Sequence, residues 1–265
     1  MMQHVDDHAP GTLIQSVQRA AALLKAFDDG PAELGVTELS RRARLHESTA
    51  SRLLATLERE GLLERVPGTE KYRLGFGLVR LAARVTRFGD VRQAARPALA
   101  ALAEASRETV HLAVLDGDEA VNVEQVAGPH IVGMAGWVGR RTPLHCVANG
   151  KALLAFQPDE TIERVLAAPL ARLTERTIVD PRRLRDELAE VRRRGYAVAL
   201  GEVEEGLHAV AAPVRDASGQ VVAAVSVSGP SYRVKAGRVD ELGQLTVDAA
   251  AEISVRLGYS VVSSQ

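Results

Sequence analysis

Apolar residues in the first part of the chain recur at helical spacing, most clearly in residues 46–61. Leu53, Leu54 and Leu57 form a single apolar stripe there, which predicts an amphipathic helix with the stripe facing inward. The first turns of the other face carry small hydroxyl groups and one arginine, at Ser48, Thr49, Ser51 and Arg52. Helix amides and short side chains at such a start favour a phosphate, and the arginine is long enough to reach a base edge. An ordinary amphipathic helix with a Ser/Thr cap is the alternative for this segment alone.

Two shorter patterns before this helix complete a helix-turn-helix. Residues 38–44 predict a short helix with Thr37 as its N-cap, and a turn at residues 45–46 joins it to the longer helix. Residues 16–27 predict a further helix whose apolar face closes the small core. Two helices joined by a tight turn are typical of a DNA-binding unit in which the second helix enters the major groove.

A predicted hairpin follows the helices. Residues 62–66 and 72–74 alternate between apolar and polar side chains on either side of a Pro67-Gly68-Thr69 turn, which is typical of two antiparallel strands. The hairpin corresponds to the wing of a winged helix. The order of three helices and a hairpin is more specific than any of these elements alone.

The charge distribution restricts a nucleic-acid surface to this region. The net charge is −1, which argues against indiscriminate coating of nucleic acid or of an anionic membrane. Basic residues gather around the turn and the hairpin, at Arg41, Arg42, Arg44, Arg52, Lys71 and Arg73. The side chains predicted to contact DNA are Thr37, Arg42, Ser48, Thr49, Ser51, Arg52, Lys71 and Arg73.

The pattern after the hairpin changes from helical to mixed. Residues 77–87 predict a helix that ends at Phe88 and Gly89 and serves as a linker or a dimer contact. Further helices are predicted at residues 91–107, 150–156, 158–167, 181–194 and 239–257. Strands are predicted at residues 110–114, 120–123, 131–134, 196–200, 207–214 and 221–227. Strands flanked by helices at both ends indicate an α+β sheet of the sensor type.

Enzyme motifs fail at positions that their chemistry requires. A dinucleotide loop would need a glycine at Arg80, and a phosphate loop would need a hydroxyl at Ala152. A nucleophile elbow at Ser226 would need a glycine at Ala224. The acidic cluster of Glu202, Glu204 and Glu205 is either acid–base machinery or a solvated loop. The sequence therefore predicts neither an enzyme nor a cofactor.

Metal binding and thiol chemistry are the remaining alternatives. The candidate zinc ligands are four histidines with the only cysteine, namely His111, His130, His145, His208 and Cys146. Their spacing forms no recognised ligand pair, and hydrogen-bonded or exposed histidines are the alternative, so no metal is predicted. A redox-sensing Cys146 would depend on His145 to lower the thiol pKa. One cysteine excludes an internal disulfide.

The start of the chain and the length of its apolar runs indicate the cellular compartment. There is no secretory n-region followed by an apolar core, and no run of about 18 apolar residues occurs. The cytoplasm is therefore the expected compartment, and a membrane is not an expected partner.

Short motifs in a fixed order extend from about Gln15 to Tyr259. In the first part they are Ser48-Thr49, Arg52-Leu53-Leu54, Glu60-Gly61-Leu62-Leu63 and Tyr72-Arg73-Leu74-Gly75. In the second part they are Pro143-Leu144-His145, Gly150-Lys151-Ala152-Leu153-Leu154-Ala155, Gly195-Tyr196-Ala197, Glu204-Glu205-Gly206, Ala211-Ala212-Pro213-Val214 and Ser226-Val227-Ser228-Gly229-Pro230. In this ordered set the chain resembles the IclR family of bacterial transcriptional regulators.

The resemblance implies an α+β chain with an N-terminal winged helix-turn-helix, a linker helix and a GAF-like α+β effector domain. The expected parts are a flexible arm at residues 1–14, the winged helix at 15–76, the linker helix at 77–90, the effector domain at 91–260 and a tail at 261–265. Members commonly form homodimers that pair into homotetramers. The implied function is a ligand-responsive repressor or activator that binds a palindromic double-stranded DNA operator as a dimer or tetramer and responds to a small organic acid.

The resemblance also places an effector site between the sheet and the loop after Pro143. It implies that the backbone amides of Ala148 and Asn149 suit a carboxylate and that the hydroxyls of Ser226 and Ser228 hold the other end of the ligand. Plain sheet packing is the alternative for the two serines. The implied lining comprises Met134, Trp137, Leu144, His145, Cys146, Ala148, Asn149, Ala199, Leu207, Ala209, Ser226 and Ser228.

This chain departs from the family pattern in the run after Gly195-Tyr196-Ala197. Where many members carry an aspartate in this run, it has Ala199 and Leu200, followed by Gly201. The loss of that polar group makes the pocket more apolar, which favours a larger or aromatic acid over a very small one such as glyoxylate.

Two other functions stay open from the sequence. The first is a GAF-type sensor or enzyme that uses Cys146 or a histidine-bound metal, and it would lose turnover or thiol oxidation on Cys146→Ser. The second is a DNA-binding structural protein without an effector. A small acid that stabilises the chain against heat would exclude it.

Overall fold

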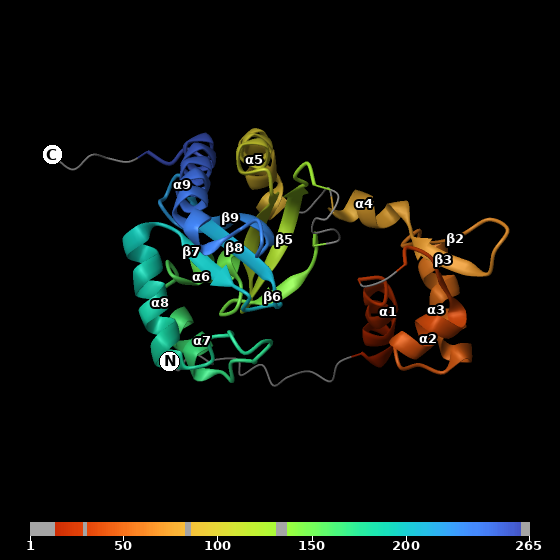
Figure 1. Cartoon of the computed structure of the whole chain (residues 1–265). Helices are drawn as coiled ribbons and strands as arrows, with labels where there is room; N and C mark the ends of the chain where they lie inside the picture. Colours follow the sequence, from red (N-terminus) through yellow and green to blue (C-terminus); the bar gives the residue numbers. More distant parts are fainter. Residues whose placement is uncertain (1–13, 29–30, 83–85, 131–136, 261–265) are drawn as a thin grey trace, which may run out of the picture. The chain divides into compact units, whose positions relative to one another are not determined.

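The computed structural model describes residues 14–28, 31–82, 86–130 and 137–260 (Figure 1). It divides into two compact units, Met1–Val85 and Thr86–Gln265. Buried apolar residues form separate cores within the two units. The predicted arm, except for Ile14, and the predicted tail at 261–265 lie outside the described residues.

The first unit follows the order of a winged helix. Its described elements are α1 (Gln15–Lys25), β1 (Leu34–Gly35), α2 (Val36–Arg42), α3 (Glu47–Arg59), β2 (Leu63–Arg65), β3 (Lys71–Leu74) and α4 (Phe76–Ala82). β3 pairs antiparallel with both β1 and β2. The core gathers the apolar stripes of the helices and the inner side of the hairpin, with Leu23, Leu39, Ala50, Leu54, Leu57, Leu63 and Tyr72 buried. β1 was not predicted, because two residues are too short to show an alternation.

The turn into α3 differs in detail from the sequence prediction. α2 begins directly after β1, so its N-cap is Gly35 and Thr37 lies in the first turn of the helix. The prediction of Thr37 as the N-cap was therefore wrong. Arg44 has a φ of 54°, and this left-handed conformation lets the backbone turn from α2 into α3. The ring of His46 caps α3 by accepting a hydrogen bond from the Ser48 amide at 3.3 Å.

The start of α4 is packed closely against the turn that follows α3. The amide of Gly75 donates to the Leu62 carbonyl and the amide of Gly77 donates to the Gly61 carbonyl, each at 2.9 Å. A Cβ at Gly75 or Gly77 would lie 2.5 or 2.4 Å from the Gly61 carbonyl oxygen. Larger residues would clash with this backbone oxygen, so the close contact requires glycine at both positions.

The linker region differs from the predicted helix of residues 77–87. α4 ends at Ala82, residues 83–85 lie outside the described part, and α5 (Thr86–Ser106) begins the second unit. α5 continues through Phe88 and Gly89, where the sequence predicted a helix end. A glycine inside a helix costs only about 1 kcal/mol relative to alanine, so the surrounding helix-forming residues outweigh it.

The second unit is built on one antiparallel sheet. Its described strands are β4 (Thr109–Asp116), β5 (Glu119–Val126), β6 (Arg141–Pro143), β7 (Ala197–Leu200), β8 (Leu207–Arg215) and β9 (Val221–Pro230), in the order β6-β5-β4-β9-β8-β7. The remaining described helices are α6 (Ala148–Leu154), α7 (Asp159–Ala167), α8 (Pro181–Arg194), the short 3₁₀ helix η1 (Ala236–Arg238) and α9 (Val239–Arg256). The predicted strand at residues 131–134 lies outside the described part, and the three-residue β6 was not predicted.

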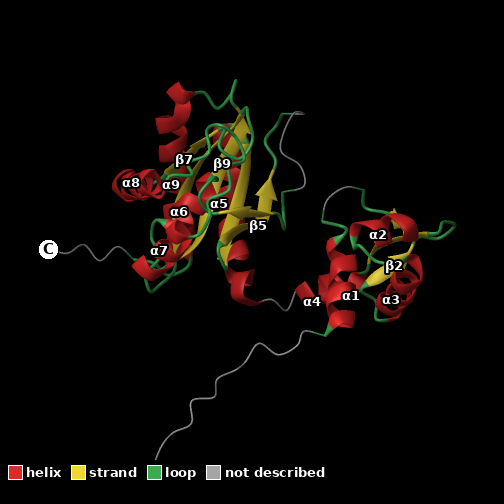
Figure 2. Cartoon of the chain, turned by 90° about the horizontal axis from the view of Figure 1, so that it is seen from below, coloured by secondary structure: helices red, strands yellow, loops and turns green. Residues whose placement is uncertain are grey.

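Helices cover both faces of this sheet (Figure 2). α5 and α9 pack on one face, where valines and leucines of β4, β8 and β9 form the larger core. α6, α7 and α8 form the second core on the other face, where the sheet contributes mainly alanines. The α+β architecture predicted from the sequence is confirmed.

Strand alternation decides which polar side chains point toward α6. In β4, Val110, Leu112 and Val114 belong to the core under α5 and α9, so His111 between them points to the opposite face. His111 is opposite Ser226 in the register of β4 and β9, and Ser228 is opposite Ala209 in the register of β9 and β8. The inner strands therefore carry a row of polar and small side chains on the α6 face.

Close packing also positions the start of α6. A Cβ at Gly150 would lie 2.4 Å from the carbonyl oxygen of Leu144. The glycine therefore lets the first turn of α6 lie directly on the preceding backbone and brings Ala148 and Asn149 to the sheet. Among the residues that the structure describes, no helix is both long and apolar enough to cross a membrane.

Candidate functional site

The outer face of α3 is the first candidate site. Ser48, Ser51 and Arg52 are exposed and Thr49 is half-buried, whereas Leu54 is fully buried beneath them. Arg52 and Thr49 also line a groove between α1 and α3, together with Ser16, Arg19, Leu53 and Thr56. The predicted orientation of the helix is thus observed, with its hydroxyl groups and arginine outward and its leucine stripe inward.

The basic residues predicted to contact DNA differ in whether acidic or carbonyl groups of the protein already bind their side chains. The guanidinium of Arg42 donates to Glu38 at 2.7 Å and to the Ala26 carbonyl at 3.0 Å, and Arg73 pairs with Glu64 at 3.0 Å. Neither Arg52 nor Lys71 forms an ion pair with the residues that the structure describes, and both are exposed. The side chain of Arg42 holds α2 against the end of α1, so Arg52 and Lys71 are the predicted cations best placed to contact DNA.

The second candidate site is a pocket on the α6 face of the sheet in the second unit. Its free space is about 440 Å³, a volume that includes open solvent at its mouth. Its described lining consists of His111, Asn122, Trp137, Thr142, Val147, Ala148, Asn149, Ala199, Val203, Leu207, Ala209, Ser226 and Ser228. Strands supply one wall, the start of α6 a second, and Trp137 and Val203 come from the loops.

Three buried polar atoms at this pocket have no hydrogen-bond partner among the described residues. They are Nε2 of His111, Oδ1 of Asn149 and Oγ of Ser226, and these side chains belong to residues that are 2, 9 and 1% exposed. Buried polar atoms in proteins are nearly always satisfied. Three such atoms lining one pocket indicate that a ligand or ordered water supplies the missing partners.

Burial controls the charge of His111. Desolvation lowers its pKa from 6.5 to about 4, and a hydrogen bond with Gln125 offsets only part of this effect. The imidazole is therefore neutral at pH 7. The centre of its ring lies 6.3 Å from that of Trp137.

The residues that line the pocket include only part of the lining implied by the family resemblance. Eight implied residues line it, namely Trp137, Ala148, Asn149, Ala199, Leu207, Ala209, Ser226 and Ser228. Met134 lies outside the described residues. The other three do not line it. Leu144 is buried in the core under α6, while His145 Nε2 bonds the Ala171 carbonyl at 2.9 Å and the Cys146 thiol donates to the Pro143 carbonyl at 3.4 Å.

Five lining residues were missed, namely His111, Asn122, Thr142, Val147 and Val203. His111 and Asn122 carried a usable signal, because each is a polar residue between two apolar residues of a predicted strand. A polar side chain at such a position points to the opposite face from its neighbours. Thr142 lies in β6, which has no sequence pattern of its own.

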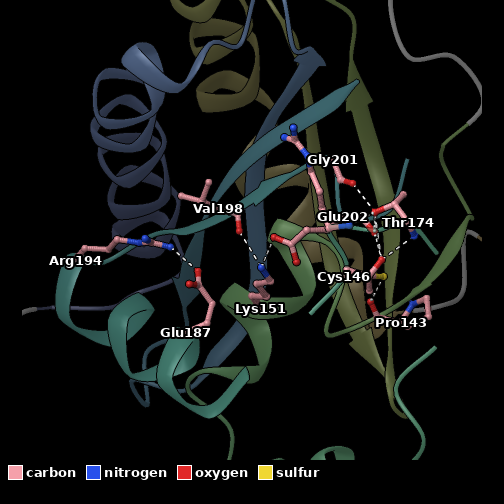
Figure 3. A network of polar contacts seen from close by, with 11 residues as sticks. Pro143, Cys146, Lys151, Thr174, Glu187, Arg194, Val198, Gly201 and Glu202 are labelled. Atoms are coloured by element: carbon pink, nitrogen blue, oxygen red, sulfur yellow. Dashed lines mark hydrogen bonds and ion pairs between the residues drawn. The ribbon is translucent and has the colours of Figure 1, made fainter. Parts of the chain in front are cut away.

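A buried ion pair lies next to the pocket and joins α6 to the segment after β7 (Figure 3). The ammonium of Lys151 donates to Glu202 at 2.6 Å and to the Val198 carbonyl at 3.0 Å, and both side chains are at most 9% exposed. The hydroxyl of Thr174 donates to the Gly201 carbonyl at 2.7 Å, and that of Thr177 donates to the Glu202 carbonyl at 2.6 Å. This network fixes the segment that carries Val203 and Leu207 into the pocket.

The candidate zinc ligands do not come together. Among the residues that the structure describes, no group of three or more histidine, cysteine or acidic side chains is arranged to hold a metal. His208, for example, bonds the Val234 carbonyl at 2.7 Å. A hydrogen-bonded or exposed role, the alternative considered from the sequence, fits these histidines better.

The thiol of Cys146 should react very slowly. Burial raises its pKa from 9.0 to about 12, with a further contribution from the nearby Glu202 carboxylate, and the thiolate is the reactive form. At pH 8 the thiolate fraction should therefore be about a thousandfold lower than for an unperturbed cysteine. We expect almost no alkylation by iodoacetamide in the native protein and full labelling in urea, measured by mass spectrometry. Rapid labelling of the native chain would restore the redox-sensor alternative.

Comparisons with known proteins match both units. The family model described as IclR helix-turn-helix domain matches residues 16–67, and the model described as bacterial transcriptional regulator IclR C-terminal matches residues 83–255. The chain is 34% identical to the HTH-type transcriptional regulator KdgR of Escherichia coli over 247 residues, which cover 93% of this chain and 94% of that protein. It is 43% identical to the HTH-type transcriptional regulator Rv1719 of Mycobacterium tuberculosis over 229 residues, covering 86 and 87% of the two chains.

A solved structure is also similar over nearly the whole chain. It is that of an IclR homolog complexed with 4-hydroxybenzoate from Microbacterium hydrocarbonoxydans, with a TM-score of 0.82 and 32% identity, and the match covers 93% of this chain and 100% of that one. Both units therefore have counterparts in transcriptional regulators, and an IclR homolog of similar fold has been solved with 4-hydroxybenzoate.

Proposed function

We propose, from the premise that this chain belongs to the IclR family of bacterial transcriptional regulators, that it binds a palindromic operator through α3 under the control of a small organic acid in the pocket of the second unit. Its relatives are DNA-binding regulators of transcription, so the chain is a regulator and not an enzyme.

The observation that carries the ligand proposal is the set of unpartnered polar atoms at His111, Asn149 and Ser226. Leaving such atoms unsatisfied costs about 1–3 kcal/mol each, and a ligand with oxygen atoms would remove this cost. The hydroxyls of Ser226 and Ser228 lie on one strand face, two residues apart, where both can donate to a ligand oxygen. Their position in the lining supports a binding role over plain sheet packing.

The apolar part of the lining supports an aromatic or similarly large acid. Ala199, Leu207 and Ala209 form an apolar wall, and Trp137 adds an aromatic one. An aspartate at position 199 would instead have offered a polar partner to a small hydrophilic acid. A structure of similar fold has been solved with 4-hydroxybenzoate, which makes this acid a reasonable first probe for the present chain.

Exposed apolar side chains on α4 support a homodimer. Phe76, Val79 and Leu81 are 72, 58 and 55% exposed, and a second copy of the unit would cover such a group of apolar side chains. A dimer would present two α3 helices to two operator half-sites, about one turn of DNA or a multiple apart. A ligand that favours one spacing of the helices would change operator affinity through a coupling of about 1–3 kcal/mol. A dimer of dimers would extend this control to a longer operator.

The proposal predicts separable effects at the pocket and at the DNA face. In a thermal-shift screen of small carboxylic acids at least one compound should stabilise the protein. The double variant Ser226→Ala with Ser228→Ala should weaken that response tenfold or more, because each hydroxyl to a charged ligand group is worth about 1.5–3 kcal/mol. Its DNA affinity without ligand should match the wild type in a gel shift at fixed salt.

Ser218→Ala is the matched control, since Ser218 is an exposed serine of the β8–β9 turn. It should leave both the ligand response and the DNA affinity unchanged. If the double variant lost both properties together, the two serines would be structural, and the proposed ligand site would be wrong.

A further inference from the structure

The side-chain amide of Asn149 has one half that is paired within the protein and one half that is not. Asn149 lies in the first turn of α6 and lines the pocket. Its Nδ2 donates to Oδ1 of Asn122 on β5 at 3.2 Å. Its Oδ1 is buried and has no partner among the described residues. Because an amide oxygen can only accept, this atom requires a hydrogen-bond donor.

The contact with Asn122 determines which way the Asn149 amide is turned. If the Asn149 amide alone were rotated by half a turn, its oxygen would meet the Asn122 oxygen, and two acceptors cannot share a hydrogen bond. The Asn149 oxygen is therefore the atom left over for another molecule. A buried acceptor without a partner is unfavourable, so a molecule that enters the pocket gains affinity by donating to it.

The serine hydroxyls and the asparagine pair occupy different parts of the pocket. Ser226 on β9 is opposite His111 in the register with β4, whereas Asn122 on β5 is opposite Ala113. The serine and the asparagine pair are thus two strands apart, about 10 Å across the sheet. A serine hydroxyl can donate to a carboxylate, but Asn149 Oδ1 cannot accept from one, because an ionised carboxylate carries no proton.

A single acid group therefore cannot satisfy both parts of the pocket. A carboxylate at the serines leaves Asn149 Oδ1 unpaired, and a carboxylate at Asn149 would bring two acceptors into contact. Nearby donors of the protein are already engaged. The Thr142 hydroxyl donates to the Ala120 carbonyl at 3.4 Å, and the Lys151 ammonium donates to Glu202 at 2.6 Å. The missing donor has to come from a second group on the ligand.

We propose that the pocket selects an acid with a hydroxyl or amino group at the end of the molecule opposite to its carboxylate, and that Asn149 determines this specificity. The inference rests on the proposed function, because it assumes that the pocket binds acids. In the complex the carboxylate accepts from the Ser226 hydroxyl, and the second group donates to Asn149 Oδ1. No covalent bond forms or breaks.

Calorimetric titration of the full chain with matched benzoates tests the inference. 4-Hydroxybenzoate and 4-aminobenzoate carry a donor opposite the carboxylate, 4-fluorobenzoate has a group there that cannot donate, and benzoate has no such group. At one pH the first two should bind about tenfold more tightly than the last two, because they remove the cost of an unpaired buried acceptor. 2-Hydroxybenzoate, whose hydroxyl is next to the carboxylate, should bind no better than benzoate.

The variant Asn149→Ala shows whether the preference comes from this side chain. Alanine removes the acceptor and favours the helix. 4-Fluorobenzoate should then bind at least as tightly as 4-hydroxybenzoate, because a buried hydroxyl without a partner is disfavoured. Gln157→Ala is the matched control. Gln157 is an amide just after the same helix that bonds the Leu153 carbonyl at 3.2 Å and is not part of the described lining, so its variant should keep the wild-type preference.

The wild-type titrations test the inference even if Asn149→Ala does not fold. Equal affinity for 4-hydroxybenzoate and 4-fluorobenzoate would mean that water satisfies Asn149 and would overturn the inference. A preference that persists in folded Asn149→Ala, or no binding by either donor-bearing benzoate, would overturn it as well. The proposed function would stand in each of these cases if any acid in the thermal-shift screen bound, and it would fail if none did.

Discussion

Lys151→Met is expected to lower the free energy of unfolding of the second unit by about 3–5 kcal/mol. The substitution leaves the Glu202 carboxylate buried without its cation, and one of its oxygens, Oε2, already has no partner among the described residues. Methionine keeps the length of the side chain, so the loss should come from charge rather than from packing. Urea unfolding followed by the fluorescence of Trp137 measures it, because this only tryptophan lies in the second unit.

The pH dependence of the stability of Lys151→Met shows whether the buried Glu202 carboxylate causes the loss. Burial raises the pKa of Glu202 above its ordinary value, even though Lys151 opposes the shift. Without Lys151 the pKa should rise further. A carboxyl with a raised folded-state pKa is most favourable when protonated, so stability is lost as pH rises from the ordinary value through the raised one. Lys151→Met should therefore recover stability between pH 7 and pH 5.

Two control variants test whether the loss of stability is specific to the buried Lys151–Glu202 pair. Lys151→Met with Glu202→Leu removes both charges and should be more stable than Lys151→Met alone. Arg164→Met breaks the exposed pair with Asp118, whose two side chains are 58 and 54% exposed, and should have little effect because water screens such pairs. A loss in Lys151→Met no larger than in Arg164→Met would show that the buried pair does not hold the segment after β7.

Arg52→Ala is expected to remove sequence-specific DNA binding while both units stay folded. Arg52 is exposed on the outer face of α3, and no acid among the described residues competes for it. An arginine contact with a base is worth about 1–3 kcal/mol of discrimination, so each protomer of a dimer should lose about ten- to hundredfold in affinity. A duplex selected from random sequences by the wild-type protein, compared with an unselected duplex at fixed salt, provides the measurement.

Arg59→Ala is the matched control, since Arg59 is an exposed arginine in the last turn of the same helix. It should reduce affinity for both duplexes slightly and alike, if at all, because it lies away from the start of the helix. Unchanged discrimination between the duplexes in Arg52→Ala would remove α3 as the reading helix.

The elements with a long regular pattern could be predicted from the sequence. The stripe of Leu53, Leu54 and Leu57 predicted α3 nearly to its ends, and the alternation of Val110, Leu112 and Val114 predicted β4. β1 and β6 were missed because two or three residues carry no periodicity. Such short strands form only because a longer neighbour offers free backbone groups.

The pocket was harder to predict than the fold, for a physical reason. Ser226 and Ser228 could be placed on one face by counting along β9, but His111 joins them only through the pairing of β4 with β9. Pairing between distant strands is not readable from a single sequence. Cys146 was expected to line the pocket because it is close in sequence to Ala148 and Asn149, which do line it. The turn before α6 directs its thiol to the Pro143 carbonyl instead.

The glycines at the start of α4 have a mechanical consequence for the first unit. Because Gly75 and Gly77 rest directly on the Gly61 carbonyl, no side chain separates the start of α4 from the turn that follows α3. If α4 rotated, the rigid backbone contact at Gly61 would make α3 move with it. Bulkier residues at positions 75 and 77 would make this contact deformable, and the position of α3 would no longer follow that of α4.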